Sequence, residues 1–185
     1  NRFILKQIKL DRNSRVLDIG CGRGKIISNL SNKLKLHNKP IGIDIENHKD
    51  KSKKIIFKKK DALSFVSKTK INFDLILIKQ TIHLVKKNQI NKLLLICKNK
   101  LNTNGKIIIL SLDPHKNEIP AFDLMKKKLK QSLKRDKSLF QLIKKFIFNI
   151  KISKNKYLQM IKNRYISTLL NFTEKQIKNG LNEID

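Results

Sequence analysis

The chain is poor in the residues that build disulfide frameworks and metal sites. It has two cysteines, three prolines and no tryptophan among 185 residues. Two cysteines cannot form a disulfide framework or a four-ligand zinc site, so we predict neither. No apolar run approaches the roughly 18 residues that a membrane-spanning helix needs, and no basic-then-apolar leader opens the sequence. These absences predict a cytoplasmic protein with no membrane partner and no bound metal.

Acidic residues are also scarce. The chain has 14 acidic and 43 basic residues, which gives a formal net charge of +29, and only six of the basic residues are arginine. Lysines spread along the whole chain, together with abundant isoleucine and asparagine, are typical of a compositional bias. A nucleic-acid interface is more often clustered and rich in arginine, whose planar fork binds phosphate. We therefore interpret the charge mainly as a solvated lysine surface, and a nucleic-acid partner stays an alternative that is not favoured.

The part of the chain from Arg15 to Leu112 alternates between strand-like and helix-like segments. Five short apolar runs are predicted as strands, at 15–19, 41–45, 54–58, 73–78 and 106–112. Apolar residues at helical spacing predict helices at 25–36 and 90–101. Continuous apolar runs are typical of strands that are covered on both faces. The sequence therefore predicts an α/β fold with a doubly wound, mostly parallel sheet flanked by helices.

Beyond Pro114 the pattern becomes mainly helical. Helices are predicted at 119–133, 157–170 and 173–184, the last with a capping box formed by Thr173 and Gln176, and a strand is predicted at 146–152. No linker rich in glycine, proline or serine interrupts the chain, so we expect a single domain over 1–185. The sequence opens on what resembles the tail of a helix at 2–10, which indicates that residues are missing at both ends.

A glycine-rich segment carries the strongest functional signal. Residues 16–25 read VLDIGCGRGK, so a buried strand ends in three alternating glycines and a helix follows. Glycines allow the backbone to turn sharply and to approach a ligand, and the helix N-terminus adds free amides. A dinucleotide fingerprint would need a glycine where Lys25 stands, and a P-loop would need serine or threonine where Ile26 stands. Both phosphate-binding motifs therefore fit poorly.

This segment resembles the first motif of the class I S-adenosylmethionine-dependent methyltransferases. Residues 73–78 resemble the fourth motif, and Gly105 resembles the turn into the fifth strand of that family. The resemblance covers 15–112 well and the remainder loosely. It implies a Rossmann-like methyltransferase fold with S-adenosyl-L-methionine as the methyl donor. In this interpretation 1–112 form the donor-binding core, and 113–185 form the acceptor side with a helical cap.

The resemblance also implies which residues bind the donor. Asp44 ends the second strand about twenty residues after the glycines, where an acidic residue takes the ribose hydroxyls in doubly wound folds. An ordinary surface acid at a strand end is the alternative for Asp44. For Cys21 we expect the backbone to contribute to donor binding and the thiol to make no contribution. The complete implied set is Asp18, Gly20, Cys21, Gly22, Gly24, Asp44, Ile45, Asp61, Ala62 and Lys79.

The sequence gives fewer indications of the residues that bind the methyl acceptor. His83 follows the fourth strand and looks like the histidine that serves as a base in some small-molecule O-methyltransferases. A packing role for His83 stays open. Gln80, His115 and Arg164 are candidates for acceptor binding, and for Arg164 an ordinary place on a helix surface is an equal alternative.

The residues after the fourth strand narrow the acceptor class. Enzymes that methylate exocyclic amino groups of bases carry an Asn/Asp-Pro-Pro-aromatic tetrapeptide there, and cytosine C5 enzymes use a cysteine beside proline. This chain has Lys79-Gln80-Thr81 at that position. We therefore predict methyl transfer to a small-molecule acceptor. The alternatives are an RNA-directed methyltransferase and a non-catalytic nucleic-acid-binding protein on the same fold.

Overall fold

The computed structural model describes residues 2–48, 50–113, 120–138, 143–144, 147 and 151–184. The chain divides into two compact units, Asn1–Leu110 and Ser111–Asp185. This division falls two residues before the predicted change from the donor-binding core to the cap region. That the two units act as a single domain stays a prediction.

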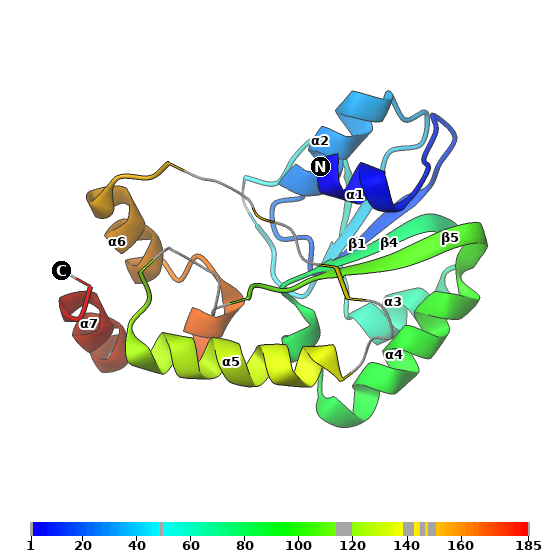
Figure 1. Cartoon of the computed structure of the whole chain (residues 1–185). Helices are drawn as coiled ribbons and strands as arrows, with labels where there is room; N and C mark the ends of the chain where they lie inside the picture. The colour runs from blue at the N-terminus through cyan, green and yellow to red at the C-terminus, as the bar shows by residue number, and fades with distance from the viewer. Residues whose placement is uncertain are drawn as a thin grey trace. The chain divides into compact units, whose positions relative to one another are not determined.

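The first unit is built on a parallel five-stranded sheet, which confirms the predicted fold class (Figure 1). The strands are β1 (Val16–Ile19), β2 (Ile41–Asp44), β3 (Ile56–Lys59), β4 (Phe73–Lys79) and β5 (Leu101–Leu110). Their order across the sheet is β3-β2-β1-β4-β5. The chain therefore winds outward from β1 in one direction through β2 and β3, and in the other through β4 and β5. Ligands of doubly wound sheets bind at the carboxyl ends of the strands where this direction reverses.

Helices cover both faces of this sheet (Figure 1). They are α1 (Arg2–Gln7), α2 (Lys25–Leu34), α3 (Ala62–Lys68), the 3-10 helix η1 (Ile82–Leu84) and α4 (Lys87–Asn99). All four residues of β1 are buried, as expected for a central strand covered on both sides. One buried cluster joins α1 and α2 to the sheet and includes Ile4, Ile27, Leu30, Val16, Leu75 and Leu77.

The position of Gly105 differs from the prediction. The resemblance implied a turn into the fifth strand there, but β5 already begins at Leu101, so Gly105 lies within the strand. The pairing of β4 with β5 shifts register between Phe73 and Leu75. A Cβ at Gly105 would lie 2.9 Å from the carbonyl oxygens of both Asn102 and Phe73. The glycine therefore permits a close backbone approach at an irregularity of the ladder.

The second unit is helical. It contains α5 (Asp123–Lys137), α6 (Lys154–Lys162), the 3-10 helix η3 (Ser167–Asn171) and α7 (Glu174–Asn182). Its own apolar core consists of Phe122, Met125, Leu129, Tyr157, Ile161, Ile166, Leu169, Phe172 and Ile177. The capping box of Thr173 and Gln176 is confirmed, whereas the strand predicted at 146–152 lies mostly outside the described residues. Among the residues described, no helix is both long and apolar enough to span a membrane.

The helix predicted at 157–170 is wrong as a single element. Helix α6 ends at Lys162, and Arg164 then adopts a left-handed φ of 50° before η3 begins. The Arg164 guanidinium donates hydrogen bonds to the carbonyl oxygens of Leu169, at 2.6 Å, and Phe172, at 2.5 Å. The chain thus folds back around this side chain, because the guanidinium supplies several donors in a fixed geometry. Helical spacing of apolar residues does not reveal such a break.

Candidate functional site

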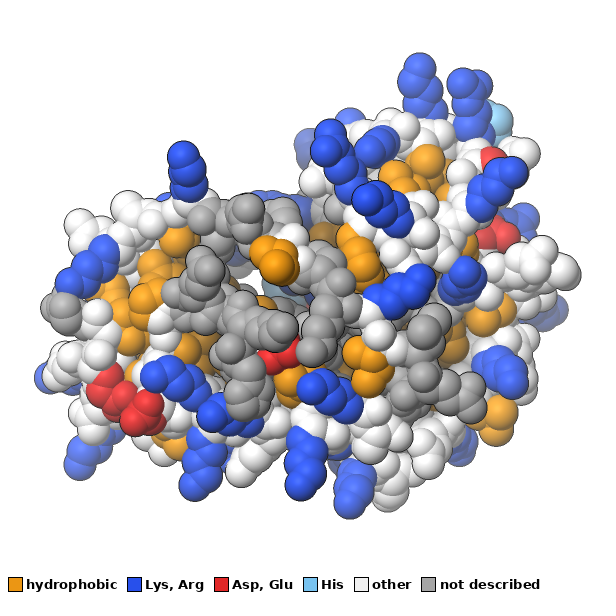
Figure 2. Space-filling model, viewed as in Figure 1, with side chains coloured by type: hydrophobic (Ala, Val, Ile, Leu, Met, Phe, Trp, Pro, Cys, Tyr) orange, Lys and Arg blue, Asp and Glu red, His pale blue; other side chains and the backbone are white. Residues whose placement is uncertain are grey.

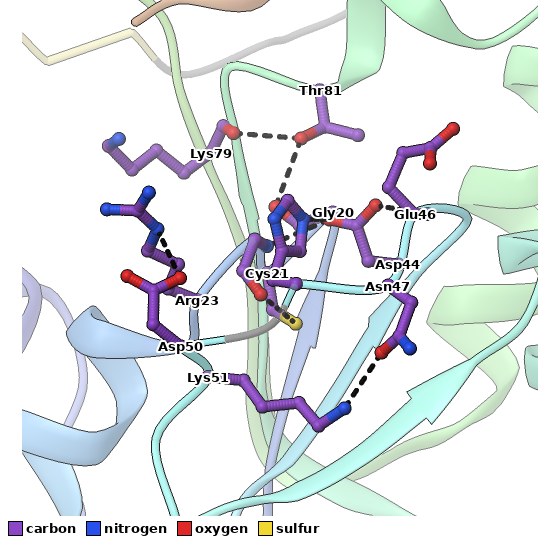
Figure 3. A network of polar contacts seen from close by, with 12 residues as sticks. Gly20, Cys21, Arg23, Asp44, Glu46, Asn47, Asp50, Lys51, Lys79 and Thr81 are labelled. Carbon is purple, nitrogen blue, oxygen red and sulfur yellow. Dashed lines mark hydrogen bonds and ion pairs between the residues drawn. The ribbon is translucent and has the colours of Figure 1, made fainter.

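The three glycines form a loop between β1 and α2, at the carboxyl ends of the strands (Figure 3). Gly20, Gly22 and Gly24 all have positive φ angles, of 69°, 52° and 67°. A Cβ at Gly20 would overlap the Thr81 side chain, and one at Gly24 would overlap Ile55. A Cβ at Gly22 would meet no atom within 4 Å. Gly20 and Gly24 are thus closely packed by side chains, whereas Gly22 borders open space.

The backbone amides of this loop bind acceptors within the protein. The amides of Gly20 and Cys21 donate to the carbonyl oxygen of Ile43, at 2.9 and 3.1 Å. The amide of Gly24 donates to the carbonyl oxygen of Cys21 at 2.9 Å. The amide of Gly22 donates to a carboxylate, Oδ2 of Asp44, at 2.8 Å. A phosphate-binding loop presents free amides to its ligand, so this arrangement agrees with the poor fit of both phosphate motifs.

Asp44 ends β2 and turns its side chain towards the glycine loop (Figure 3). Its Oδ1 accepts a second hydrogen bond, from the backbone amide of Glu46 at 3.0 Å. The side chain is 15% exposed, and each carboxylate oxygen keeps a lone pair for a further donor. The next residue, Ile45, leaves 61% of its surface exposed. The end of β2 therefore presents a hydrogen-bond acceptor directly beside an uncovered apolar side chain.

Asp18 lies in β1 and is almost completely buried, with 3% of its surface exposed. Its Oδ1 has no hydrogen-bond partner among the described residues. Burial raises the pKa of Asp18 to about 8; Lys79 opposes this shift and Asp44 adds to it. A buried polar atom without a partner is uncommon in proteins and indicates an absent donor, such as a ligand ammonium group.

These two carboxylates and the exposed isoleucine fit S-adenosyl-L-methionine. The donor carries an ammonium group for a buried carboxylate such as Asp18, and ribose hydroxyls for an acceptor such as Asp44. Its adenine ring is an apolar plane that suits an exposed side chain such as Ile45. A phosphate would instead meet the Asp44 carboxylate, which is electrostatically unfavourable.

Cys21 contributes its backbone to the loop, and its thiol is packed away. Burial is the main cause that raises the pKa of the Cys21 thiol to about 12, with further contributions from Asp18 and Asp44. A Cβ at Gly42 would lie 2.7 Å from the Cys21 sulfur, so the thiol occupies the space that this glycine leaves free. The thiol therefore stays protonated at neutral pH and is not a nucleophile.

The segment after β4 lies against the glycine loop. Gln80 has a left-handed φ of 50° and donates its backbone amide to the carbonyl oxygen of Leu110 at 2.8 Å. The Thr81 hydroxyl donates to the carbonyl oxygen of Lys79 at 2.9 Å, and its side chain packs on Gly20 (Figure 3). Non-glycine residues in the left-handed region are strained and gather at functional sites. His83 follows in η1 and is half-buried.

The other candidate residues are placed as follows. The Asp61 carboxylate accepts a hydrogen bond from the backbone amide of Ser64 at 2.9 Å and thereby caps α3, which begins at Ala62. His115 lies outside the described residues. Arg164 lies in the second unit, where it also pairs with Glu174 at 2.5 Å. The contacts of Arg164 are internal to its unit, so its role in acceptor binding stays a prediction that these contacts do not support.

Several contacts around the loop have no signal in the sequence. Arg23 forms an ion pair with Asp50, with 2.9 Å between Nε and Oδ1, and both side chains are more than half exposed (Figure 3). The backbone amide of Ser52 donates to the carbonyl oxygen of Arg23 at 3.0 Å. His48 places Nε2 3.7 Å from Oδ2 of Asp44. The connection between β2 and β3 thus folds against the glycine loop, which only the tertiary structure reveals.

Comparison with known proteins identifies the relatives of this fold. A family described as "Methyltransferase domain" matches residues 10–165. No curated protein matches the chain. The crystal structure of an Anabaena variabilis protein assigned to the methyltransferases of an antibiotic biosynthesis pathway is 14% identical, with a TM-score of 0.68. The alignment covers 99% of this chain and 82% of that chain.

Two further solved structures are similar. An S-adenosylmethionine-dependent methyltransferase from Archaeoglobus fulgidus is 23% identical over 99% of this chain and 85% of that chain, with a TM-score of 0.51. The plantazolicin methyltransferase is 23% identical over 55% of this chain and 39% of that chain, with a TM-score of 0.48. The present chain thus aligns with less than half of the plantazolicin enzyme.

Proposed function

The chain belongs to the class I S-adenosylmethionine-dependent methyltransferases, and we propose that it transfers the methyl group to a small-molecule acceptor. S-adenosyl-L-methionine is the methyl donor of this family. One observation carries the donor assignment: the Asp44 carboxylate is turned onto the amide of Gly22, and it acts electrostatically on the buried Asp18, whose Oδ1 has no partner among the described residues. This arrangement supports a ligand that carries both hydroxyls and a positive charge.

The protein's part in the reaction is to hold the two reactants in line. The donor supplies an electrophilic methyl group on a sulfonium, and the rate of its transfer depends mainly on alignment with the attacking atom. In this proposal Asp18 binds the ammonium group, Asp44 binds the ribose hydroxyls, and Ile45 lies against the adenine ring. Asp61 and Ala62, after β3, border the adenine, and Lys79 orients the amino-acid end of the donor.

His83 is the proposed proton acceptor. It follows β4 closely and is half-buried, and imidazole has a pKa suited to proton transfer near neutral pH. A base is needed if the attacking atom is a hydroxyl, and Gln80 would then orient the acceptor. If the attacking atom is an amine that is already neutral, no base is needed and His83 only packs.

The residues after β4 support a small acceptor. Lys79-Gln80-Thr81 contains neither the tetrapeptide of amino-group base methylation nor the cysteine of cytosine C5 methylation. The net charge of +29 is the observation that favours a second candidate, an RNA-directed methyltransferase. A non-catalytic role is disfavoured, because the open space at Gly22 and the unpartnered Asp18 are features of a site that takes a ligand.

The donor assignment is tested by calorimetry. We expect the chain to bind S-adenosyl-L-methionine and its demethylated product, S-adenosyl-L-homocysteine, in a one-to-one ratio. Absence of binding to both would refute the assignment. The acceptor class is tested separately, by release of the demethylated product in the presence of pooled small metabolites or of total RNA. Turnover with RNA and not with the metabolite pools would favour the RNA-directed methyltransferase over the small-molecule methyltransferase.

A further inference from the structure

Helix α5 carries an unusual density of positive charge for one element of this chain. Seven of its fifteen residues are basic and two are acidic. Figure 2 shows lysine and arginine side chains spread over the visible face, including the region where Figure 1 places α5. High charge alone is expected of this composition. The arrangement of the lysines on the helix is therefore the informative feature.

Four of these lysines lie in one line. Lys127, Lys130, Lys134 and Lys137 follow one another at spacings of three, four and three residues, and all are exposed. With 3.6 residues per turn this pattern places them on a single side of the helix, over about 15 Å of its length. We call these four residues the lysine row. One ion pair of this helix joins Lys126 to Asp123, which are not part of the row.

The lysine row lowers the stability of the helix unless an anion binds to it. Like charges three or four residues apart destabilise a helix by roughly 0.2–0.5 kcal/mol per pair. The helix dipole offsets this cost near the C-terminus, for Lys134 and Lys137. It does not offset it for Lys127 and Lys130, which lie in the middle of the helix. A line of exposed cations in the folded protein is complementary to a line of anions.

We propose that the lysine row binds the phosphate backbone of a double-stranded nucleic acid. Lysine is a point charge that binds phosphates without reading bases, so the contact would be independent of sequence. Binding of single strands uses aromatic side chains on which bases stack, and α5 contains no aromatic residue. DNA and RNA duplexes share the phosphate chemistry, and the experiment below separates them.

A membrane surface fits the same helix less well. A helix that lies in a membrane inserts an apolar face beneath its charged face. The apolar face of α5 is already used, because Met125 and Leu129 are buried in the core of the second unit. The proposal does not depend on the acceptor that the enzyme methylates, and it adds a docking surface to the proposed function.

The test compares two variants of the full chain that have the same net charge. In the first, Lys127, Lys130, Lys134 and Lys137 are changed to glutamine, which keeps the helix propensity. In the matched control, four exposed lysines of the first unit are changed to glutamine: Lys9, Lys39, Lys70 and Lys92. Fluorescence anisotropy measures binding to duplex RNA and duplex DNA of 20 base pairs over a series of salt concentrations. Vesicles with anionic lipid headgroups are a third probe.

We expect the lysine-row variant to lose at least tenfold in duplex affinity at about 100 mM salt. The slope of log affinity against log salt should fall by about 3 to 4, because each phosphate contact contributes about 0.9. We expect the control to lose less than twofold, and both variants to bind S-adenosyl-L-methionine like the unchanged chain. Preference for one duplex would identify RNA or DNA as the source of the phosphates.

Three outcomes would overturn the proposal. Equal loss in both variants would mean that net charge alone binds the duplex. Unchanged affinity in the lysine-row variant would place the contact elsewhere. Binding to anionic vesicles that exceeds duplex binding, and is lost in the lysine-row variant, would make a membrane surface the partner. Absence of donor binding to the unchanged chain, with duplex binding retained and lost in the lysine-row variant, would refute the donor site and leave this proposal standing.

Discussion

The Asp44 carboxylate and the Gly22 backbone amide are joined by a hydrogen bond of 2.8 Å between Oδ2 and N. The bond connects the end of β2 to the loop that follows β1. It orients the carboxylate towards the only one of the three loop glycines at which an added Cβ would meet no neighbour. One hydrogen bond between neighbouring strand ends therefore sets the direction in which the Asp44 carboxylate points.

The variant Asp44→Asn tests whether the Asp44 carboxylate binds the donor, with little disturbance of the glycine loop. Asparagine keeps one oxygen for the Gly22 amide but loses the charge and the second acceptor. Hydrogen bonds to charged groups contribute about 1.5–3 kcal/mol, so we expect donor affinity to fall roughly 10- to 100-fold by calorimetry. The control is Glu46→Gln at the exposed neighbour, which should bind the donor normally. Equal affinity in both variants would contradict the assignment of Asp44.

The glycines at 20 and 22 should respond differently to alanine. Both have positive φ, so each alanine strains the backbone by about 1–2 kcal/mol. In Gly20→Ala the new Cβ also overlaps Thr81, whereas in Gly22→Ala it enters open space. We expect thermal unfolding to show the larger loss of stability for Gly20→Ala. Gly22→Ala should keep most of its stability and weaken donor binding. The same loss of stability in both variants would mean that the Thr81 contact is unimportant.

The buried Asp18 predicts how stability depends on pH. Its pKa is raised by burial from 3.8 to about 8, so the folded chain holds this proton more tightly than the unfolded chain does. The proton on Asp18 therefore stabilises the folded chain fully below about pH 4, and this stabilisation is lost progressively as the pH rises to about 8. We expect Asp18→Asn, measured by thermal unfolding without donor, to gain in stability relative to the unchanged chain over this interval. A constant difference across pH would show that Asp18 does not titrate there.

His83→Asn tests the proposed base. Asparagine is polar and close to histidine in size, but it takes no proton near neutral pH. If the attacking atom is a hydroxyl, we expect turnover to fall about 100-fold or more while donor affinity by calorimetry stays within twofold. The pH dependence of turnover attributable to the imidazole should also disappear. An unchanged profile of turnover against pH would assign His83 a packing role only.

Arg164→Lys tests the internal role that the structure indicates for Arg164. Lysine keeps the charge but cannot donate in the same geometry to Leu169, Phe172 and Glu174. We expect a loss of about 1–3 kcal/mol in the unfolding free energy from urea titration. The control is Arg23→Lys, whose exposed pair with Asp50 should contribute less than about 1 kcal/mol. Unchanged stability together with a raised acceptor KM would instead assign Arg164 to acceptor binding.

The pattern of apolar residues was sufficient to predict the sheet, whereas the residues of the donor site stay a prediction. Five apolar runs predicted five strands in a mostly parallel sheet, because strands that are covered on both faces are typically near-continuous apolar runs. The glycine spacing and the acid at the end of the second strand indicated the donor site, since parallel strands bring their carboxyl ends to one edge of the sheet. Where helix α6 stops was not predictable. The break at Arg164 depends on carbonyl oxygens of residues that approach only after folding.

The amino-acid sequence by itself determined the class of fold, the place of the glycine loop and the identity of its acidic residues. These features depend on local periodicity and on residue type. Only the tertiary structure decided that Oδ1 of Asp18 has no partner among the described residues, that Thr81 fills the space above Gly20, and that the Asp44 carboxylate bonds to Gly22. Such features arise between segments that are far apart in the chain. Their interaction energies depend on burial and close contact, which the order of residues does not reveal.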